Sequence, residues 1–357
     1  MTKEKLLIVI NSQFGCCVDV YKRCEYLKED YDITVLCFYS GDEKQEIPGV
    51  KVVYVPWTGP YVIRGMKFIL CSLWHILWFK GIVYVEYFEK CIWLKRLLPF
   101  KKMILDVRTM AVLGTQADRD RYDRCIEQAC NKYDVVSVIS EGVKQKLHGD
   151  DNMFILPLGA DIISPTDKVI DTLRLIYVGT FSGRDIDKTI RAVSVFHHKH
   201  PDIPITYDII GSGCNNELSE LRNLNETLGC SDFIILHGRI PNQRLKPYFD
   251  KANIGVSFVP MTDYYDKQPP TKTFEYTLSG MYTIATRTTE NARFVTPECG
   301  CLIDDTEEDF VKAIEYIWKN KERIDSKKVR SSMLEFQWER IVNKYVRKIL
   351  DYYKESL

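Results

Sequence analysis

The 357-residue chain carries no excess of either charge, because 49 Lys and Arg residues balance 49 Asp and Glu residues. A general electrostatic field that holds nucleic acid requires a basic surface, so this balance argues against a nucleic-acid partner. Short internal repeats and low-complexity segments are absent as well. The hydrophobic share of 45% is that of an ordinary globular protein.

Paired cysteine spacings and a secretory leader are also missing. The twelve cysteines form no CxxC pairs of the kind that bind zinc or carry out redox chemistry. The N-terminus does not resemble a signal peptide, so we expect reduced cysteines in a cytoplasmic protein, most of them serving as small buried hydrophobic residues. The histidines at 197, 198 and 200 point to different faces of a predicted helix, and we expect no metal site there.

No uninterrupted apolar run is long enough to span a bilayer. The richest segment, 61–80, predicts a helix with several aromatic residues, but Arg64, Lys67 and His75 interrupt it. Two interpretations stay open: a core helix of the first domain, or a helix at a membrane surface with its tryptophans at headgroup level. The segment 93–102 mixes apolar and basic residues, which favours the membrane surface.

Two strand–loop–helix units of nucleotide-binding type open the two halves of the chain. The length predicts two domains of roughly 150–200 residues. Strand 5–10 leads through a loop with Gly15 into a helix over 18–29, and strand 173–178 leads through a loop with Gly179 into a second helix. The first loop has a single glycine, so no dinucleotide fingerprint is present, and an ordinary strand-to-helix turn is the alternative.

Strands 82–88 and 102–107 are nearly continuous in apolar residues, as expected for a parallel sheet that is covered on both faces. Open α/β sheets bind ligands outside the carboxyl ends of their strands. Asp106 and Arg108, at the end of the second strand, are therefore candidates for ligand contact. A structural ion pair is the alternative.

The most informative stretch is 255–280, which predicts a buried strand, a polar loop with paired tyrosines, and a helix that starts after two prolines and ends at Gly280. The free N–H groups of a helix start favour an anion, and Lys272 adds a positive charge in the first turn. Glu275 shares that face of the helix. The lysine would meet phosphate and the carboxylate would accept hydrogen bonds from sugar hydroxyls, as a nucleotide sugar requires. A local ion pair on a solvated helix end is the alternative.

The run Pro-Thr-Lys-Thr-Phe-Glu-Tyr at 270–276 resembles the donor-site helix of family-four retaining glycosyltransferases of the GT-B fold. In that family the helix glutamate, here Glu275, binds the nucleotide ribose. Many members carry a second glutamate eight residues earlier, near the transferred sugar, where this chain has Lys267. Many also carry a histidine near the position of Arg108. The chain thus resembles the subgroup with a lysine in the first helical turn, and the resemblance is strongest in the second half.

The resemblance also implies further site residues. Arg184 and Lys188 match an arginine and a lysine that clamp the donor diphosphate, with a solvated helix start as the alternative. The loop with Gly15 would reach donor phosphate and acceptor, and the loops after the strands at 206–210 and 233–238 would lie beside the nucleotide and its base. The catalytic candidates are Lys272, Arg184, Lys188, Asp106 and Arg108. The donor-binding candidates are Gly15, Gly179, Thr180, Gly211, Gly213, Arg239, Ile240, Thr271, Lys272 and Glu275.

We therefore predict an α/β protein of the GT-B fold, with two Rossmann-like, doubly wound domains that face each other across a cleft. Residues 1–165 would bind the acceptor, with a C-terminal helix at about 336–357 packing back on them, and residues 166–335 would bind the donor. The resemblance implies a metal-independent, retaining transfer of a hexosyl group from a nucleoside-diphosphate sugar to a saccharide or lipid-linked acceptor. Surface polysaccharide assembly is the expected setting.

No cofactor is expected besides the nucleotide-sugar substrate. The expected location is cytoplasmic, peripheral on the inner face of the membrane if 61–102 contacts it. Two other functions fit the same architecture. Because Lys267 and Arg108 depart from the family pattern, a non-catalytic scaffold that binds nucleotide sugars is one alternative. A nucleotide-sugar epimerase is the other.

Overall fold

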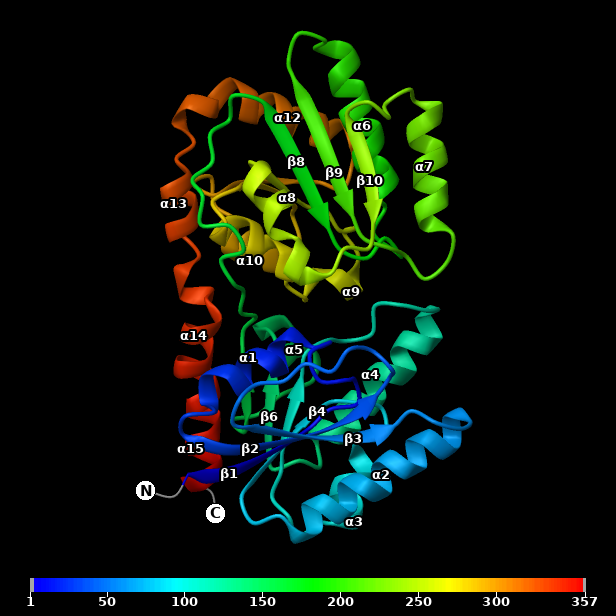
Figure 1. Cartoon of the computed structure of the whole chain (residues 1–357), viewed down its shortest axis with the longest axis vertical. Helices are drawn as coiled ribbons and strands as arrows, with labels where there is room; N and C mark the ends of the chain where they lie inside the picture. The colour runs from blue at the N-terminus through cyan, green and yellow to red at the C-terminus, as the bar shows by residue number, and fades with distance from the viewer. Residues whose placement is uncertain (1–2, 356–357) are drawn as a thin grey trace. The chain divides into compact units, whose positions relative to one another are not determined.

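The computed structural model describes residues 3–355, and the chain divides into two compact units. Unit 1 comprises Met1–Leu158 together with Trp338–Leu357, and unit 2 comprises Gly159–Gln337. Each unit is a parallel sheet flanked by helices (Figure 1), so the predicted α/β class with two Rossmann-like sheets is confirmed.

Unit 1 is built on seven parallel strands in the order β3-β2-β1-β4-β5-β6-β7. The strand order reverses between β1 and β4, so the topological switch point of this doubly wound sheet lies between these two strands. The strands are β1 (Glu4–Val9), β2 (Tyr31–Tyr39), β3 (Val50–Pro56), β4 (Ile82–Glu86), β5 (Ile104–Val107), β6 (Val135–Val138) and β7 (Met153–Ile155). The helices are α1 (Val18–Leu27), α2 (Tyr61–Trp78), α3 (Ile92–Leu97), α4 (Gln116–Cys130), α5 (Glu141–Lys146), α14 (Trp338–Ile341) and α15 (Arg347–Glu355), with a π-helical turn at Val342–Val346.

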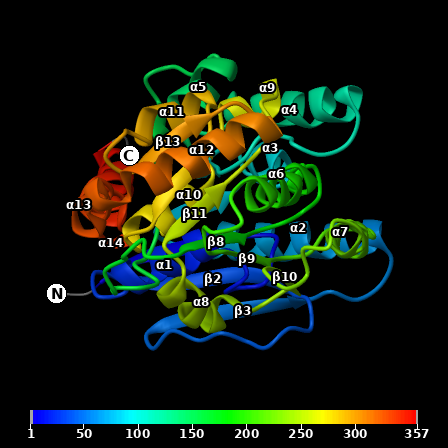
Figure 2. The same cartoon turned by 90° about the horizontal axis from the view of Figure 1, so that it is seen from above.

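Unit 2 repeats the plan with six parallel strands in the order β10-β9-β8-β11-β12-β13 and its switch point between β8 and β11. Figure 2 shows α6 and α8 on opposite sides of β8. The strands are β8 (Leu173–Val178), β9 (Ile205–Ile210), β10 (Ile234–Gly238), β11 (Ile254–Ser257), β12 (Tyr282–Thr286) and β13 (Gly300–Ile303). The helices are α6 (Ile186–Lys199), α7 (Glu217–Thr227), α8 (Lys246–Lys251), α9 (Asp263–Asp266), α10 (Thr271–Leu278), α11 (Thr289–Phe294), α12 (Glu307–Asn320) and α13 (Ser326–Ser331).

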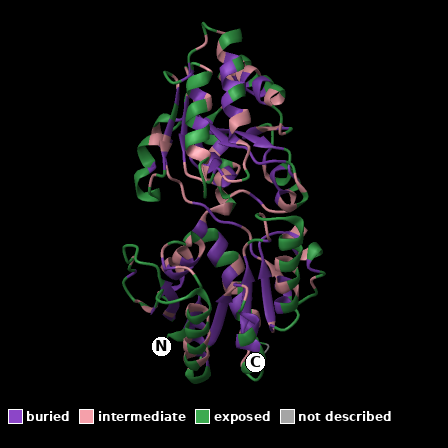
Figure 3. Cartoon of the chain, turned by 90° about the vertical axis from the view of Figure 1, so that its right-hand side faces the viewer, coloured by how far each residue is buried: buried purple, intermediate pink, exposed green. Residues whose placement is uncertain are grey.

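The strands form the core of each unit because their side chains are apolar on both faces. β5 and β6 are buried along their whole length, and so are β11 and β12. Figure 3 shows the buried residues along the sheets and the exposed residues on the outer faces of the helices. Gly280 ends α10 with φ +77°, as predicted, and Ser140 caps α5 by accepting the Val143 N–H at 3.1 Å.

The boundary between the units lies at 158/159, where the sequence placed it at 165/166. Hydrogen bonds explain the earlier position. The Ala160 N–H donates to the Phe336 carbonyl at 2.9 Å, and the Lys168 ammonium donates to Ser164 Oγ at 3.0 Å and to the Asp250 carbonyl at 3.1 Å. The segment with linker composition is therefore tied into unit 2.

Helix α2 is less buried than a core helix would be. A core helix was one of the two interpretations of segment 61–80. Of its 18 residues, only Phe68, Ser72 and Ile76 are buried. These three positions are four residues apart and share one face, which packs on unit 1. The rest of the helix is exposed or half-buried, so the core interpretation is wrong. No helix within residues 3–355 is both long and apolar enough to cross a membrane.

Candidate functional site

The strongest candidate site lies at the switch point of unit 2, where β8 and β11 end side by side. Backbone hydrogen bonds join the loops after β8 and β9: Gly179 N–H to the Ile210 carbonyl at 3.0 Å, and Phe181 N–H to the Ser212 carbonyl at 3.0 Å. The chain that leaves β11 returns through α9 to the start of α10 at Thr271. Open α/β sheets bind ligands at this position.

Two glycines in these loops leave room for close neighbours, the backbone of the adjoining loop at Gly211 and two side chains at Gly179. A Cβ on Gly211 would lie 1.8 Å from the Gly179 carbonyl oxygen. A Cβ on Gly179 would lie 3.2 Å from Lys272 Nζ and 3.3 Å from the Tyr177 hydroxyl. Gly211 therefore lets the two loops pack together, and Gly179 leaves room for the Lys272 ammonium beside the loop after β8.

Lys272 lies in the first turn of α10, half-buried, with its ammonium over an aromatic ring. Its Nζ is 3.8 Å from the centroid of the Tyr177 ring, whose hydroxyl donates to the Thr180 carbonyl at 2.6 Å. The ring attracts the cation through its negative face and also fixes its direction. The amino end of α10, which no side chain of the described residues caps, lies beside it.

Arg184 comes from the loop after β8 and lies on a second aromatic ring. Its guanidinium carbon is 4.1 Å from the centroid of Tyr265, a buried residue of α9. Arg184 is close enough to Lys272 to lower the pKa of that ammonium. The structure thus brings together two of the predicted diphosphate-binding cations, from positions 88 residues apart in the chain.

These two cations have no carboxylate at ion-pair distance within the described range 3–355. Burial, and next the charge of Arg184, hold the pKa of Lys272 well below its usual range, while Glu275 opposes the shift. A bound anion would relieve the repulsion between the two side chains. The site therefore favours a compact, multiply charged anion such as a pyrophosphate.

Glu275 lies one turn further along α10, half-buried and without an ion-pair partner in the described part of the chain. Burial, and next the charge of Asp161, together raise its pKa to about 7, while Lys272 acts in the opposite direction. The carboxyl group is therefore partly protonated near neutral pH. A hydrogen-bonding ligand would find both donor and acceptor capacity there.

The remaining donor-binding candidates of unit 2 lie around this edge of the sheet. Thr180 and Thr271 are exposed, the first after β8 and the second at the first position of α10. Arg239 is exposed just after β10, and Ile240 packs against the apolar cluster that contains Phe249 and Tyr276. Gly213 follows β9, close to the Glu217 carboxylate.

Lys188 differs from the other two predicted cations because carboxylates already surround it. Its ammonium lies 3.1 Å from the Asp185 carboxylate and 4.0 Å from that of Asp305, and it donates to the Asp305 carbonyl at 3.1 Å. Its charge is therefore largely compensated without a ligand. Its diphosphate role stays a prediction.

Asp106 and Arg108 belong to a network of charges inside unit 1. Asp106 is fully buried, 2.6 Å from Arg23 and 2.6 Å from the Ser137 hydroxyl that donates to it. Arg108 donates to Asp19 at 2.6 Å and to the Leu156 carbonyl at 2.6 Å. Asp106 and Arg108 thus belong to an internal ion-pair network, as in the structural alternative to ligand contact, and their catalytic role stays a prediction.

Gly15, the candidate from the first loop, has φ +94° and follows β1 at the switch point of unit 1. A Cβ there would lie 2.5 Å from the Gln45 side chain. Glu86 ends β4 at the same switch point. Burial raises the pKa of Glu86 to about 7, and the Cys17 thiol lies 3.5 Å from both of its oxygens.

Sequence reasoning did not assign Tyr177, Tyr265 or Asp161 to the site. The paired tyrosines in the loop before α10 were a visible signal, but nothing local connects Tyr265 with Arg184. Tyr177 reads as an ordinary strand residue, and Asp161 lies in the turn that leaves unit 1. Lys267, at the position of the second glutamate, is half-buried at the end of α9.

The histidines at 197, 198 and 200 each have a local partner. His198 Nδ1 lies 2.8 Å from the Ser194 carbonyl, and His200 Nε2 lies 3.0 Å from Glu315. The His197 ring packs on Phe233 with centroids 4.2 Å apart. Between residues 3 and 355, no group of three His, Cys, Asp or Glu side chains is placed to hold a metal ion.

Comparison with known families finds that residues 204–347 match the model of a glycosyl transferase-like family. The matched part is less than half of the chain and includes β10, β11 and α10. No curated protein matches the chain in sequence.

Solved structures match over nearly the whole chain at low sequence identity. Sucrose-phosphate synthase from Thermosynechococcus elongatus is 17% identical with a TM-score of 0.80, covering 99% of this chain and 100% of that one. A glycosyltransferase from Rickettsia africae is 13% identical with a TM-score of 0.73, and HepE from Anabaena in complex with UDP is 10% identical with a TM-score of 0.68; each match covers 99% of both chains. The GT-B fold predicted from the resemblance is therefore confirmed.

Proposed function

We propose that this protein is a glycosyltransferase that takes a sugar from a nucleoside-diphosphate sugar bound to unit 2. One observation carries the proposal: Lys272 and Arg184 converge at the start of α10 without a carboxylate partner in the described residues. The glycosyl transferase-like match over 204–347 supports it. HepE, a protein of the same fold, has been solved with UDP and with UDP-glucose.

In the proposed reaction the sugar keeps its anomeric configuration. The acceptor oxygen bonds to the anomeric carbon on the face from which the diphosphate departs. The acceptor proton passes to the departing diphosphate oxygen as the carbon–oxygen bond breaks. The protein then needs no nucleophile of its own, and its task is to position the reactants and neutralise the charge that grows on the diphosphate.

Lys272, Arg184 and the amino end of α10 would carry out that neutralisation, without a metal ion. A fixed cation aimed at a developing negative charge contributes about a hundredfold or more in rate. Glu275 would accept hydrogen bonds from the ribose hydroxyls. The acceptor is proposed to be a saccharide or a lipid-linked saccharide of a surface polysaccharide. The proposal includes a contact between segment 61–102 and a membrane surface.

A thermal-shift screen against UDP-, GDP-, ADP- and dTDP-sugars tests the donor proposal. We expect one nucleotide series to raise the melting temperature of the wild type, and Lys272→Ala to lose that shift. If none of the nucleotide sugars shifts the wild type, the donor site is misassigned.

Slow hydrolysis of the selected donor without acceptor then tests catalysis. A glycosyltransferase releases free sugar and nucleoside diphosphate. A scaffold with the same fold binds the donor and leaves it intact, and an epimerase returns an isomeric nucleotide sugar. Chromatography of the nucleotide products separates the three outcomes.

A further inference from the structure

We propose that the face formed by α2 and α3 of unit 1, called here the α2–α3 face, docks on an anionic lipid bilayer. On this face α2 lies along the surface and its outward apolar side chains enter the boundary between headgroups and acyl chains. The inference does not depend on the donor site, since it uses residues of unit 1 alone.

The first observation is the apolar stripe on the outside of α2. Val62, Met66, Leu70, Trp74 and Trp78 follow one another at intervals of four, so they form a continuous row that winds slowly along the exposed half of the helix. Their exposed fractions are 68%, 56%, 63%, 63% and 67%. An amphipathic helix of a water-soluble surface carries polar residues on that side. Large apolar patches of this kind mark interaction sites.

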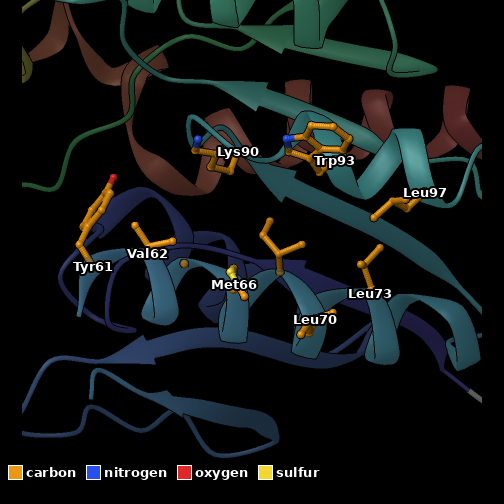
Figure 4. A pocket seen from close by; sticks show the side chains of 10 residues that line it. Tyr61, Val62, Met66, Leu70, Leu73, Lys90, Trp93 and Leu97 are labelled. Carbon is orange, nitrogen blue, oxygen red and sulfur yellow. The ribbon is translucent and has the colours of Figure 1, made fainter. Parts of the chain in front are cut away.

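The second observation is that α3 extends the apolar surface. Trp93 and Leu97 of α3 are 45% and 55% exposed, and Phe100 just beyond it is 69% exposed. Between α2 and α3 lies a cavity of about 390 Å³ with an almost entirely apolar lining. Figure 4 shows Trp93 and Leu97 above it and the α2 side chains below, with Lys90 at its edge.

The third observation is the sign of the charge around this surface. The whole chain is neutral, but residues 57–102 hold eight Lys and Arg against two carboxylates, Glu86 and Glu89. Lys95 is held by Asp134 at 2.7 Å, and Glu86 faces the Cys17 thiol. The exposed cations of the segment are Lys67, Lys80, Lys90 and Arg96.

Charge and aromatic placement select the bilayer over a protein partner. Each basic residue near an anionic surface strengthens binding about fivefold, and tryptophan prefers the headgroup level. The Arg96 guanidinium lies 5.1 Å from the Trp93 ring, so cation and indole are presented together. A second copy would place the same cations opposite one another across a two-fold axis, where they repel. The occupant that matches both the apolar stripe and the cations is therefore an anionic lipid surface.

Vesicle flotation tests the proposal with the full-length protein. Vesicles of phosphatidylglycerol and phosphatidylcholine in equal amounts are compared with pure phosphatidylcholine. We expect at least tenfold stronger partitioning of the wild type to the anionic vesicles, weakened when NaCl rises from about 0.05 to about 0.5 M. Leu70→Glu/Trp74→Glu should lower partitioning at least tenfold.

Val169→Glu/Val195→Glu is the matched control, because these residues of unit 2 are 71% and 51% exposed and the change in net charge is the same. We expect the control to float like the wild type, and both variants to keep the wild-type melting temperature and nucleotide-induced thermal shift. The proposal is overturned if the wild type stays at the bottom of the gradient, or if both double variants float equally. If sedimentation equilibrium shows that the wild type is a dimer and that Leu70→Glu/Trp74→Glu is a monomer, the α2–α3 face binds a second copy of the chain instead.

Discussion

The two units place charged clusters at equivalent edges of similar sheets, yet the clusters are built in opposite ways. In unit 1, Arg23 and Arg108 meet Asp106 and Asp19 at distances down to 2.6 Å, and Asp106 is fully buried. In unit 2, Lys272 and Arg184 lie on the rings of Tyr177 and Tyr265 with no carboxylate at ion-pair distance in the described part of the chain.

The difference teaches how a structural cluster is distinguished from a binding site on the same fold. A closed network satisfies its charges internally, so removing one partner leaves a buried charge uncompensated. An open pair of cations is held by aromatic rings and remains under mutual repulsion until an anion arrives. The first arrangement should contribute to stability and the second to binding.

The largest effect is expected when the closed network is broken. Asp106→Ala removes the carboxylate nearest to buried Arg23, which then keeps only the more distant Asp19 carboxylate at 3.8 Å, and we expect a loss of about 3–5 kcal/mol in the free energy of unfolding. Urea denaturation followed by tryptophan fluorescence measures it. The double variant Arg23→Met/Asp106→Leu removes both charges and should recover most of the loss. If Asp106→Ala lowers the free energy of unfolding by less than about 1 kcal/mol, the cluster of unit 1 does not stabilise the fold as proposed.

Removing a cation from the cluster of unit 2 should lower turnover and leave the stability of the protein nearly unchanged. Lys272→Ala is expected to lower turnover about 100- to 1000-fold, because it removes charge stabilisation from the departing diphosphate. Its melting temperature should stay level or rise, since a repelled, half-buried cation is lost. Lys188→Ala is the comparison variant, and we expect a smaller loss of turnover because its charge is already compensated by Asp185 and Asp305. Turnover of Lys272→Ala within twofold of the wild type would contradict the proposed role.

The raised pKa of Glu275 gives unit 2 a pH dependence of definite sign. Burial raises this pKa from 4.5 to about 7. The folded state thus holds its proton over a range in which the unfolded state has lost it, and stability falls as pH rises from about 4.5 to 7. The shift corresponds to at most about 3 kcal/mol. The melting temperature of Glu275→Gln minus that of the wild type should therefore grow between pH 4.5 and 7.5. A difference that stays constant over this range would show that Glu275 is not buried as described.

The smallest effect concerns the ring that carries Arg184. Tyr265→Leu removes the aromatic face, and we expect donor affinity to fall about threefold to fivefold relative to Tyr265→Phe, which keeps the ring. Isothermal titration calorimetry with the selected nucleoside diphosphate measures the affinity of both variants. Equal affinities of the two variants would mean that the ring does not orient Arg184.

Much of the candidate site of unit 2 could be predicted from short stretches of sequence. The prolines before Thr271 and the glycine at 280 mark the two ends of α10, and the helix runs over Thr271–Leu278. Lys272 and Glu275 follow from that boundary, because their spacing within one helix determines the face that they share. The glycines at 179 and 211 follow strands that the apolar runs predicted within one or two residues.

The partners of the charged residues could not be predicted in this way. Arg108 meets Asp19 across 89 positions, and Arg184 meets Tyr265 across a comparable separation. For α2, the apolar pattern was compatible with a core helix as well as a surface helix, and the structure leaves most of the helix exposed.

The sequence by itself determined the elements and their ends, because hydrophobic period, proline and glycine act on neighbouring residues. Only the tertiary structure decided which charges are neutralised by ion pairs and, within residues 3–355, which cations have no carboxylate partner. It also decided which apolar side of α2 is exposed to solvent. Those outcomes depend on strand order and packing between segments far apart in the chain, and no local pattern contains that information.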